Sequence, residues 1–584
     1  MSVKKTGIFL LVLLVLGAFY YYYEIKRGAE REKAKAEAEK IFHLQKEEVT
    51  GFILTRGEES IRVVRQDKTW RIAEPVQAEG DYQANDQLLS TVLGATRERM
   101  LEEKNPDLEA FGLKNPSLSL TLLADNQTSE TLLVGMQNPT RTGYYAMRKE
   151  EPGLFLISNF LKEGIDKSLF DLRDKTVISW ATDRVTRIEI ATPSLHLTVE
   201  QQGEDWQIIS PLTAKADGRK IRAFLDLLRS AKVKAFVEEE PADLTPYALQ
   251  PAEKRVTLFL GEDKAQKTLL FGKKDQEKGW VYAKREEKSP VFFVEPRLPE
   301  SIPERVDDWR DRTVLVFDKE KITKLELASD QETVVVEKKG EERWELTQPF
   351  VARADKDKIN NLLWDLYGLK VKEFITEAAP DLAAYGLDTP VRRIRLWAKD
   401  QEKPLTLLIG KKAEGKEGSY ARVETQGNVI LLREKDVTAL SKSAADLQDK
   451  RILSFETDQV ARFRLTYPEK TLVLEKEKGK WRVVEPEAAS STYWKVSSLL
   501  YKIRNLSFVE KVAPSSSAAD YGFDTPAVKI TLWDKEGKEL ATLTVGKSLE
   551  NQEYRYARDA AGQVYTIKAD FLKALPTEVS ALQG

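Results

Sequence analysis

Three copies of a motif with two aspartates and a following basic residue are the best candidates for chemistry in this sequence. The copies are Asp171/Asp174/Lys175, Asp308/Asp311/Arg312 and Asp446/Asp449/Lys450. Paired carboxylates are ligands that divalent cations such as Ca²⁺ prefer. Each copy, however, lies where one repeating unit of the chain meets the next. That placement favours a structural role, in which Asp174, Asp311 and Asp449 cap or pair at a junction.

A second candidate is the stretch Gly546-Lys547-Ser548, which resembles the end of a phosphate-binding loop. The loop needs an earlier glycine five residues before, and Ala541 stands there. The corresponding turn elsewhere reads Gly410-Lys411-Lys412. The stretch is therefore interpreted as a turn at the end of a strand, and no nucleotide site is predicted.

Other residue types that commonly act in catalysis or bind metals are scarce in this sequence. The chain has no cysteine and two histidines, His43 and His196, which lie far apart in the sequence. Both are interpreted as ordinary residues, and the acidic run Glu238–Glu240 as solvated. The net charge of −2 shows no basic excess of the kind that nucleic acids attract. The sequence thus predicts a non-enzymatic protein with no catalytic residue, cofactor, metal or nucleic-acid partner; a carboxylate-based hydrolase is the least favoured alternative.

The elements that would position these residues follow one pattern that occurs four times, about every 137 residues. Each copy has a Trp, an aliphatic residue two positions on and a Pro five positions on: Trp70/Ile72/Pro75, Trp206/Ile208/Pro211, Trp344/Leu346/Pro349 and Trp481/Val483/Pro486. Exposed aromatics can stack on sugars or peptides. A Trp retained in every copy on a strand that its Pro ends is more typical of a core. The pattern is interpreted as the core signature of a duplicated domain.

Each copy also carries signals for strands and for one helix. A short apolar strand such as Ile41–Leu44 opens the unit, and alternating strands follow it. Natural N-cap residues come after the Trp strand, each followed by apolar residues at helical spacing: Asp81, Asp217, Asp355 and Thr492. Copy one has Asn85 at the first apolar position, so we expect its helix to start loosely.

A turn with an aromatic residue, a glycine and an apolar residue follows the helix. The glycine positions are Gly112, Ala248, Gly386 and Gly522. Glycine here predicts a positive φ, so Ala248 marks a strained or altered turn. Three further strands follow; the second ends at Gly135, Gly272, Gly410 or Gly546, and the third carries Tyr145, Tyr282, Tyr420 or Tyr556.

A period this long makes each copy a domain with its own core. The predicted class is α+β, with four tandem domains built on largely antiparallel sheets. The predicted boundaries are 1–5 for a short tail, 6–23 for a transmembrane anchor, 24–40 for a charged helical stalk, and 41–176, 177–313, 314–451 and 452–584 for the four domains.

The anchor prediction rests on the uncharged run Thr6–Tyr23, which is about as long as a bilayer is thick and ends in four tyrosines. A cleaved signal peptide is the alternative, but no small-residue cleavage site follows the apolar run. The basic residues after the run favour a cytoplasmic location by the positive-inside rule. Large domains often cross regardless of local charge, so an extracytoplasmic location on the inner membrane is predicted.

With the repeats assembled, the chain resembles the bacterial family designated domain of unknown function 4340. Trp344…Pro349 with Tyr385-Gly386-Leu387, and Trp481…Pro486 with Tyr521-Gly522-Phe523, carry the resemblance best, whereas Ala248 departs from it. The resemblance implies an envelope protein that accompanies ABC-type transporter subunits or another envelope protein, and it transfers no site residues. A peptidoglycan-, glycan- or lipid-binding module is the alternative. The oligomeric state stays open.

Overall fold

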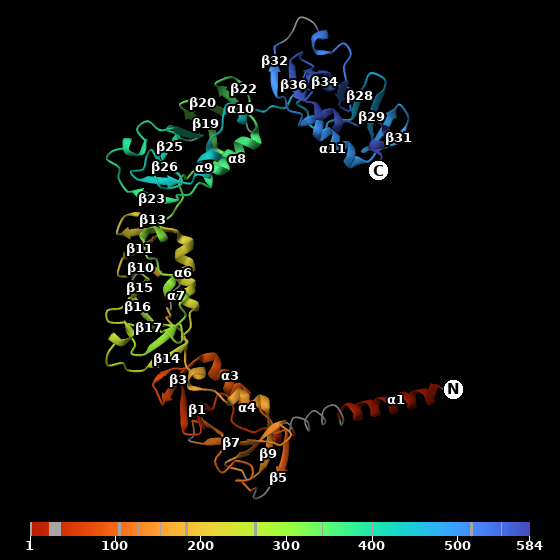
Figure 1. The fold of residues 1–584 in the computed structure, drawn as a ribbon. Coiled ribbons are helices and arrows are strands. Elements are labelled where there is room, and N and C mark those ends of the chain that lie inside the picture. The colour runs from red at the N-terminus through yellow and green to blue at the C-terminus, as the bar shows by residue number, and fades with distance from the viewer. Residues whose placement is uncertain are drawn as a thin grey trace. The chain divides into compact units, whose positions relative to one another are not determined.

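The structure is a computed structural model, and it describes residues 3–22, 35, 37–102, 107–125, 128–151, 153–180, 185–261, 265–340, 343–399, 401–513, 518–550 and 552–583. The chain divides into two compact units, Met1–Asp311 and Arg312–Gly584, which are described separately. Each unit contains two nine-stranded sheets, and the four sheets have the same strand order. Figure 1 shows the ribbon with many of its helices and strands labelled.

The N-terminal segment begins with helix α1 (Val3–Tyr20). Within the part of the chain that the structure describes, no helix has both the length and the apolar character that a membrane crossing requires. Of the predicted anchor, Tyr23 lies outside the described residues, and so does most of the predicted stalk. The described end of the stalk has an ion pair between Lys40 and Glu37 at 2.7 Å.

The first repeat shows the topology that all four share. Its strands run in the order β4-β3-β2-β1-β6-β7-β8-β9-β5, and every pairing is antiparallel. Two meanders thus meet at the central pair β1–β6, and the long helix connects one edge strand to the other. The elements are β1 (Val49–Arg56), β2 (Glu59–Gln66), β3 (Thr69–Glu74), β4 (Ala78–Glu79), α3 (Tyr82–Leu93), β5 (Arg99–Glu102), β6 (Leu118–Ala124), β7 (Ser129–Gln137), β8 (Gly143–Arg148), β9 (Leu154–Ser158), α4 (Asn159–Ile165) and α5 (Leu169–Leu172).

The second repeat completes the first unit. Its elements are β10 (Val185–Ala191), β11 (His196–Gln202), β12 (Asp205–Ser210), β13 (Ala214–Lys215), α6 (Gly218–Ser230), β14 (Ala235–Glu238), η2 (Thr245–Tyr247), β15 (Lys254–Leu260), β16 (Ala265–Lys274), β17 (Val281–Arg285), β18 (Val291–Val294), α7 (Arg297–Glu300) and η3 (Val306–Asp308).

The second unit contains repeats three and four. Repeat three has η4 (Lys319–Lys321), β19 (Ile322–Ser329), β20 (Thr333–Lys338), β21 (Trp344–Gln348), β22 (Ala352–Arg353), α8 (Lys356–Tyr367), β23 (Glu373–Thr376), η5 (Ala383–Tyr385), β24 (Arg392–Ala398), β25 (Leu405–Lys412), β26 (Ser419–Val423), β27 (Val429–Leu432), α9 (Glu434–Leu440) and α10 (Ala444–Leu447). Repeat four has β28 (Arg462–Thr466), β29 (Thr471–Glu477), β30 (Lys480–Glu485), β31 (Ala489–Ser490), α11 (Tyr493–Arg504), β32 (Glu510–Val512), η6 (Ala518–Tyr521), β33 (Val528–Trp533), β34 (Glu539–Ser548), β35 (Tyr554–Asp559), β36 (Val564–Lys568), η7 (Ala569–Ala574) and η8 (Val579–Leu582).

Four tandem α+β domains with antiparallel sheets are therefore present, but two details of the sequence prediction are wrong. The opening segments, such as Ile41–Leu44, are not strands; Ile41 and Phe42 are buried without joining the sheet. In addition, the prediction lacks the strands equivalent to β4, β5 and β9. Strand β9 is continuously apolar and shows no alternation, and the other two are very short.

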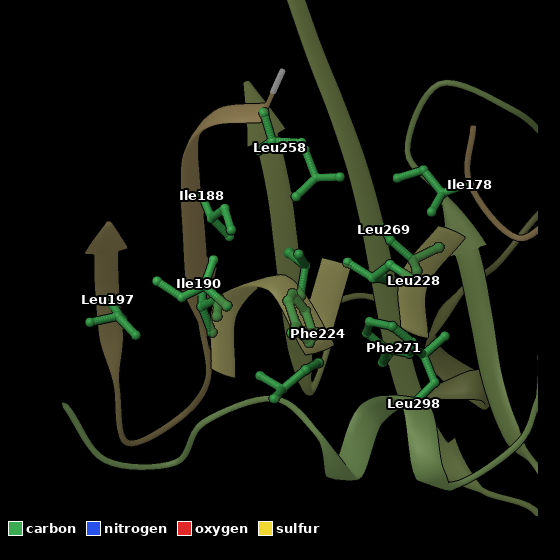
Figure 2. Close-up of a cluster of buried hydrophobic side chains, with 14 of the residues drawn as sticks. Ile178, Ile188, Ile190, Leu197, Phe224, Leu228, Leu258, Leu269, Phe271 and Leu298 are labelled. Atoms are coloured by element: carbon green, nitrogen blue, oxygen red, sulfur yellow. The ribbon is translucent and has the colours of Figure 1, made fainter. Parts of the chain in front are cut away.

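Each repeat has its own hydrophobic core between the sheet and the long helix. In the second repeat, Phe224 and Leu228 of α6 lie among sheet residues that include Ile190, Leu258 and Leu269 (Figure 2). The signature tryptophans belong to these cores and are 2–5% exposed: Trp70, Trp206, Trp344 and Trp481. The peptide bond before each signature proline is cis: Pro75, Pro211, Pro349 and Pro486.

The long helices begin at the predicted caps. The side chains of Asp81, Asp217 and Asp355 accept hydrogen bonds from backbone amides of the first turn, whereas Thr492 makes no side-chain cap. The expectation of a loose start at Asn85 is wrong. Asn85 is fully buried, and its amide donates to the carbonyls of Asp81 and Leu172 at 2.6 and 2.8 Å.

Candidate functional site

The connections between successive repeats are short straps that hydrogen-bond to the domain on each side. After the first repeat, Asp174 N donates to the Glu79 carbonyl, and Val233 N donates to the Lys175 carbonyl of the strap. The strap thus pairs backward with β4 and forward with the segment after α6. Equivalent pairings recur along the chain: Ala216–Arg310 and Thr313–Lys370 around the second strap, and Ala354–Gln448 and Arg451–Ser507 around the third. In the first and third straps, which each lie within one compact unit, the residues that pair backward and forward are only a few positions apart.

The first aspartate of the predicted motif caps the short helix that leads into the strap. Asp171 Oδ2 accepts from Ser168 N at 2.8 Å, and Asp446 Oδ2 accepts from Ser443 N at 2.9 Å. The backbone and hydroxyl hydrogen bonds from Ser443 lower the pKa of Asp446. These carboxylates therefore serve the backbone in the way that a capping box does.

The second aspartate has different partners in different copies. Asp174 Oδ1 accepts a hydrogen bond from Thr176 N at 3.0 Å. Asp449, whose side chain is 2% exposed, binds Arg451 at 2.7 Å and Arg353 at 3.1 Å. Burial acts against ionisation there, but the hydrogen bonds from Arg451 lower the pKa of Asp449. Across the described ranges, no group of three or more acidic or histidine side chains is arranged to hold a metal ion.

The first strap borders a charged cavity of about 770 Å³ between the first and second repeats. The guanidinium of Arg173 lies 3.3 Å from the centre of the Phe236 ring and binds Glu239 at 2.5 and 2.8 Å. Lys288 of the second repeat binds Glu79 of the first at 2.9 Å. Two ion pairs that connect the first and second repeats therefore lie along the cavity wall.

The charge state of one cavity carboxylate bears on the hydrolase alternative. The hydrogen bond from Lys288 lowers the pKa of Glu79, against the opposing effect of burial. A carboxylic acid that donates a proton at neutral pH needs the opposite shift. Glu79 is therefore arranged for an ion pair.

The two histidines lie apart. His196 is exposed at the start of β11. His43 Nδ1 is 2.9 Å from Nη1 of the buried Arg148, which also binds Glu151 at 2.6 Å. In the second repeat, Arg285 occupies the same strand position and donates to the carbonyls of Thr176 and Val177. Both arginines thus hold the segment that opens their repeat against its own sheet.

The retained glycines have a steric explanation. A Cβ at Gly135, Gly272, Gly410 or Gly546 would overlap the carbonyl oxygen of the aromatic residue in the preceding turn. The rings of that turn residue and the retained tyrosine have centroids 4.7–5.1 Å apart: Phe111–Tyr145, Tyr247–Tyr282, Tyr385–Tyr420 and Tyr521–Tyr556. Gly546-Lys547-Ser548 accordingly forms the end of β34.

The predicted positive φ is present in all four turns. Gly112, Gly386 and Gly522 have φ between 64° and 71°, and Ala248 has φ 54° and ψ 39°. Ala248 thus keeps the turn in a conformation that an L-residue adopts at a cost.

Sequence reasoning missed a small cavity beside helix α8. It has a volume of about 250 Å³ and is lined by Lys319, Glu320, Lys338, Trp344, Lys356, Asn360, Leu363 and Trp364. Lysines and an asparagine on a helix are ordinary surface residues, so no motif marks the site. The signal that could have found the cavity is a difference between the four copies at matching solvent-facing positions of the long helix.

A family model described as "Domain of unknown function (DUF4340)" matches four stretches, residues 70–205, 206–345, 344–510 and 481–583. The matches begin at the signature tryptophans, so the first three cover most of one structural domain and the start of the next, and the fourth lies within the last repeat. No curated protein matches. Among solved structures, the crystal structure of the DNA polymerase III subunit beta from Pseudomonas aeruginosa is similar at 7% identity over 66% of this chain and 92% of that one. Its TM-score is 0.11, which is too low to indicate a shared fold.

Proposed function

Because this chain belongs to the DUF4340 family, we propose that it is a membrane-anchored, non-enzymatic protein of the bacterial envelope that acts as an accessory or scaffold component of an ABC-type transport complex. The observation that carries the proposal is the serial strap. Each domain is hydrogen-bonded to the connector beside it, and the fold-defining residues repeat in every copy. Such a chain suits the presentation of several similar surfaces in a fixed order.

The location in this proposal comes from the sequence. The uncharged run Thr6–Tyr23 serves as a single anchor, and the large C-terminal region lies outside the inner membrane. The partners would be subunits of the transporter or another envelope protein.

A topology experiment tests the location first. A fusion at Gly584 to alkaline phosphatase and, separately, to green fluorescent protein distinguishes the two sides of the membrane. We expect phosphatase activity and no fluorescence. If the green fluorescent protein fusion is fluorescent and the phosphatase fusion is inactive, the domains lie in the cytoplasm and the proposal is contradicted.

Co-purification tests the partner. The full-length chain is crosslinked in native membranes, extracted in mild detergent and recovered through a C-terminal tag. We expect a transporter permease to be recovered by the wild type and lost when Arg173 and Glu239 are both replaced by alanine, because this pair joins two domains. Crosslinked material that contains no transport subunit would contradict the scaffold role.

A second candidate function, the binding of glycans, is favoured by exposed aromatic residues on the long helices of the second unit. Trp364 and Tyr367 of α8 are 58% and 47% exposed, and Trp494 and Tyr501 of α11 are 65% and 64% exposed. Exposed rings of this kind stack on sugars. Retention on purified peptidoglycan that is lost in Trp364→Ala or Trp494→Ala would support it.

A further inference from the structure

The cavity beside α8 combines positive charge with an aromatic wall. Lys319 comes from η4, Lys338 from the end of β20, and Asn360 and Trp364 from α8. Trp344 and Leu363 are buried and form the base of the cavity. Glu320 is the acidic residue among the lining side chains.

Two of the lining lysines, Lys319 and Lys338, are not paired with a neighbouring carboxylate in the part of the chain that the structure describes. The ammonium of Lys319 lies 3.3 Å from the centre of the Trp364 ring and 4.5 Å from that of Tyr367. No ion pair to Lys319 or Lys338 is present among those residues. A cation held on an aromatic face keeps its charge available for a ligand.

The first repeat shows the same site in a closed form. Counted from the helix caps, Asp86 matches Asn360 (81 + 5 and 355 + 5), and Ser90 matches Trp364 (81 + 9 and 355 + 9). Lys46, the counterpart of Lys319, binds Asp86 at 2.9 Å and Ser90 at 3.3 Å.

The contrast between the two repeats is chemical. Repeat three has an amide in place of the carboxylate and an indole in place of the hydroxyl. The backbone elements around the site are the same in both repeats. Lys319 differs from Lys46 because it has no counterpart of Asp86 to pair with.

We propose that this cavity binds a single acidic sugar residue of a glycan through its carboxylate. The lysines would pair with the carboxylate, and the Asn360 amide would hydrogen-bond to a ring hydroxyl. The Trp364 indole supplies the apolar wall against which the C–H face of a sugar ring packs. A volume of about 250 Å³ accommodates one monosaccharide.

The shape favours a sugar over a membrane surface. A membrane contact needs a broad apolar face that projects outward, whereas the exposed ring of Trp364 lies among the polar side chains of Lys319, Glu320 and Asn360. This inference sharpens the glycan-binding candidate and requires neither the membrane anchor nor the transporter. The topology and co-purification experiments therefore fail or succeed independently of it.

The test is isothermal titration of the full-length protein, in mild detergent, with a hyaluronan tetrasaccharide, which contains glucuronate. Uncharged cellotetraose is the matched ligand control. We expect binding of the acidic tetrasaccharide only, weakened at least about tenfold in Asn360→Asp, because the new carboxylate pairs with Lys319 as Asp86 pairs with Lys46.

Asn361→Asp is the matched protein control. Asn361 is the exposed neighbour on the same helix and does not line the cavity, so this variant has the same net charge as Asn360→Asp. It should bind as the wild type does. Lys338→Gln, a second variant outside the helix, should also weaken binding.

Three results would overturn the proposal. They are equal affinity of the wild type and Asn360→Asp, equal affinity for cellotetraose, and no heat of binding at millimolar tetrasaccharide. Sedimentation with phosphatidylglycerol vesicles that is abolished by Asn360→Asp, without tetrasaccharide binding, would assign the cavity to a lipid headgroup and would also overturn it.

Discussion

The first and third repeats have the same sheet order, the same helix cap and the same left-handed turn, yet they differ on the outer face of the long helix. In repeat one, Lys46 is bound by Asp86; in repeat three, Lys319 lies on Trp364 beside Asn360. The residues that the two copies share build the domain. Apart from the buried pair Asn85 and Ile359, the differences described here lie on the solvent-facing side of α3 and α8, where a change does not alter the core. Copy-specific function should therefore be sought there.

The straps that leave these two repeats differ as well. Asp174 accepts one backbone hydrogen bond, whereas Asp449 is buried between two arginines. The backbone pairings around the straps are nevertheless the same. The strap is thus a shared feature, and its side-chain pairing is copy-specific.

The largest expected effect tests what the copies share. Gly135→Ala and Gly410→Ala should each destabilise their own repeat by about 3 kcal/mol or more, because the new Cβ overlaps the carbonyl of Phe111 or Tyr385. Hydrogen–deuterium exchange by mass spectrometry measures this separately for peptides of each repeat. A variant that leaves protection unchanged in its own repeat would show that the turn is not held by this contact. Gly57→Ala, where a Cβ meets open space but φ is +60°, should cost only about 1 kcal/mol.

The next effect tests the difference between the straps. Asp449→Asn should destabilise the junction of repeats three and four by about 2 kcal/mol, since it leaves the guanidinium groups of Arg353 and Arg451 without their carboxylate. Asp174→Asn should cost less than Asp449→Asn, about 1 kcal/mol, because the amide oxygen still accepts from Thr176 although the negative charge that acts on Arg285 is lost. Equal losses would remove the distinction between the two straps.

The Asp449 effect also has a pH dependence with a defined sign. The pKa of Asp449 is lowered in the folded chain, so its contribution is fully present above the unfolded pKa of about 4. It is lost as the pH falls through the lower folded value. The difference in unfolding free energy between wild type and Asp449→Asn should therefore be constant near pH 7 and shrink below about pH 4.

The smallest effect concerns the helix of repeat one. Asn85→Ile should stabilise the repeat by about 1 kcal/mol, because Ile359 occupies the matching position in repeat three and the Oδ1 atom of Asn85 is buried without a partner among the described residues. The carbonyls of Asp81 and Leu172 keep their backbone donors, Asn85 N and Asp81 N. Thermal unfolding and exchange of the α3 peptides measure the gain. A loss of stability would show that the amide bonds of Asn85 outweigh the apolar contact.

Much of the fold could be predicted from repetition. The helix caps, the buried tryptophans and the left-handed turn, including Ala248, follow from local residue chemistry that four copies display together. The opening segments could not be recognised, because Ile41 and Phe42 are apolar for packing and not for pairing in the sheet. The prediction of a loose helix start at Asn85 is wrong because the side chain of Asp81 caps the helix and Asn85 itself is packed in the interior. The cavity at Lys319 could not be predicted because its lining comes from four separate elements, η4, β20, β21 and α8.

The straps have a consequence for how such a chain evolves. Each strap uses one set of backbone positions on the domain before it and another on the domain after it, and these positions are equivalent in every copy. A tandem duplication that carries one domain with its strap therefore brings both halves of a junction with it. The number of domains can therefore change by gene duplication without the selection of a new interface. Each added copy can then accumulate its own substitutions on the solvent-facing side of its long helix.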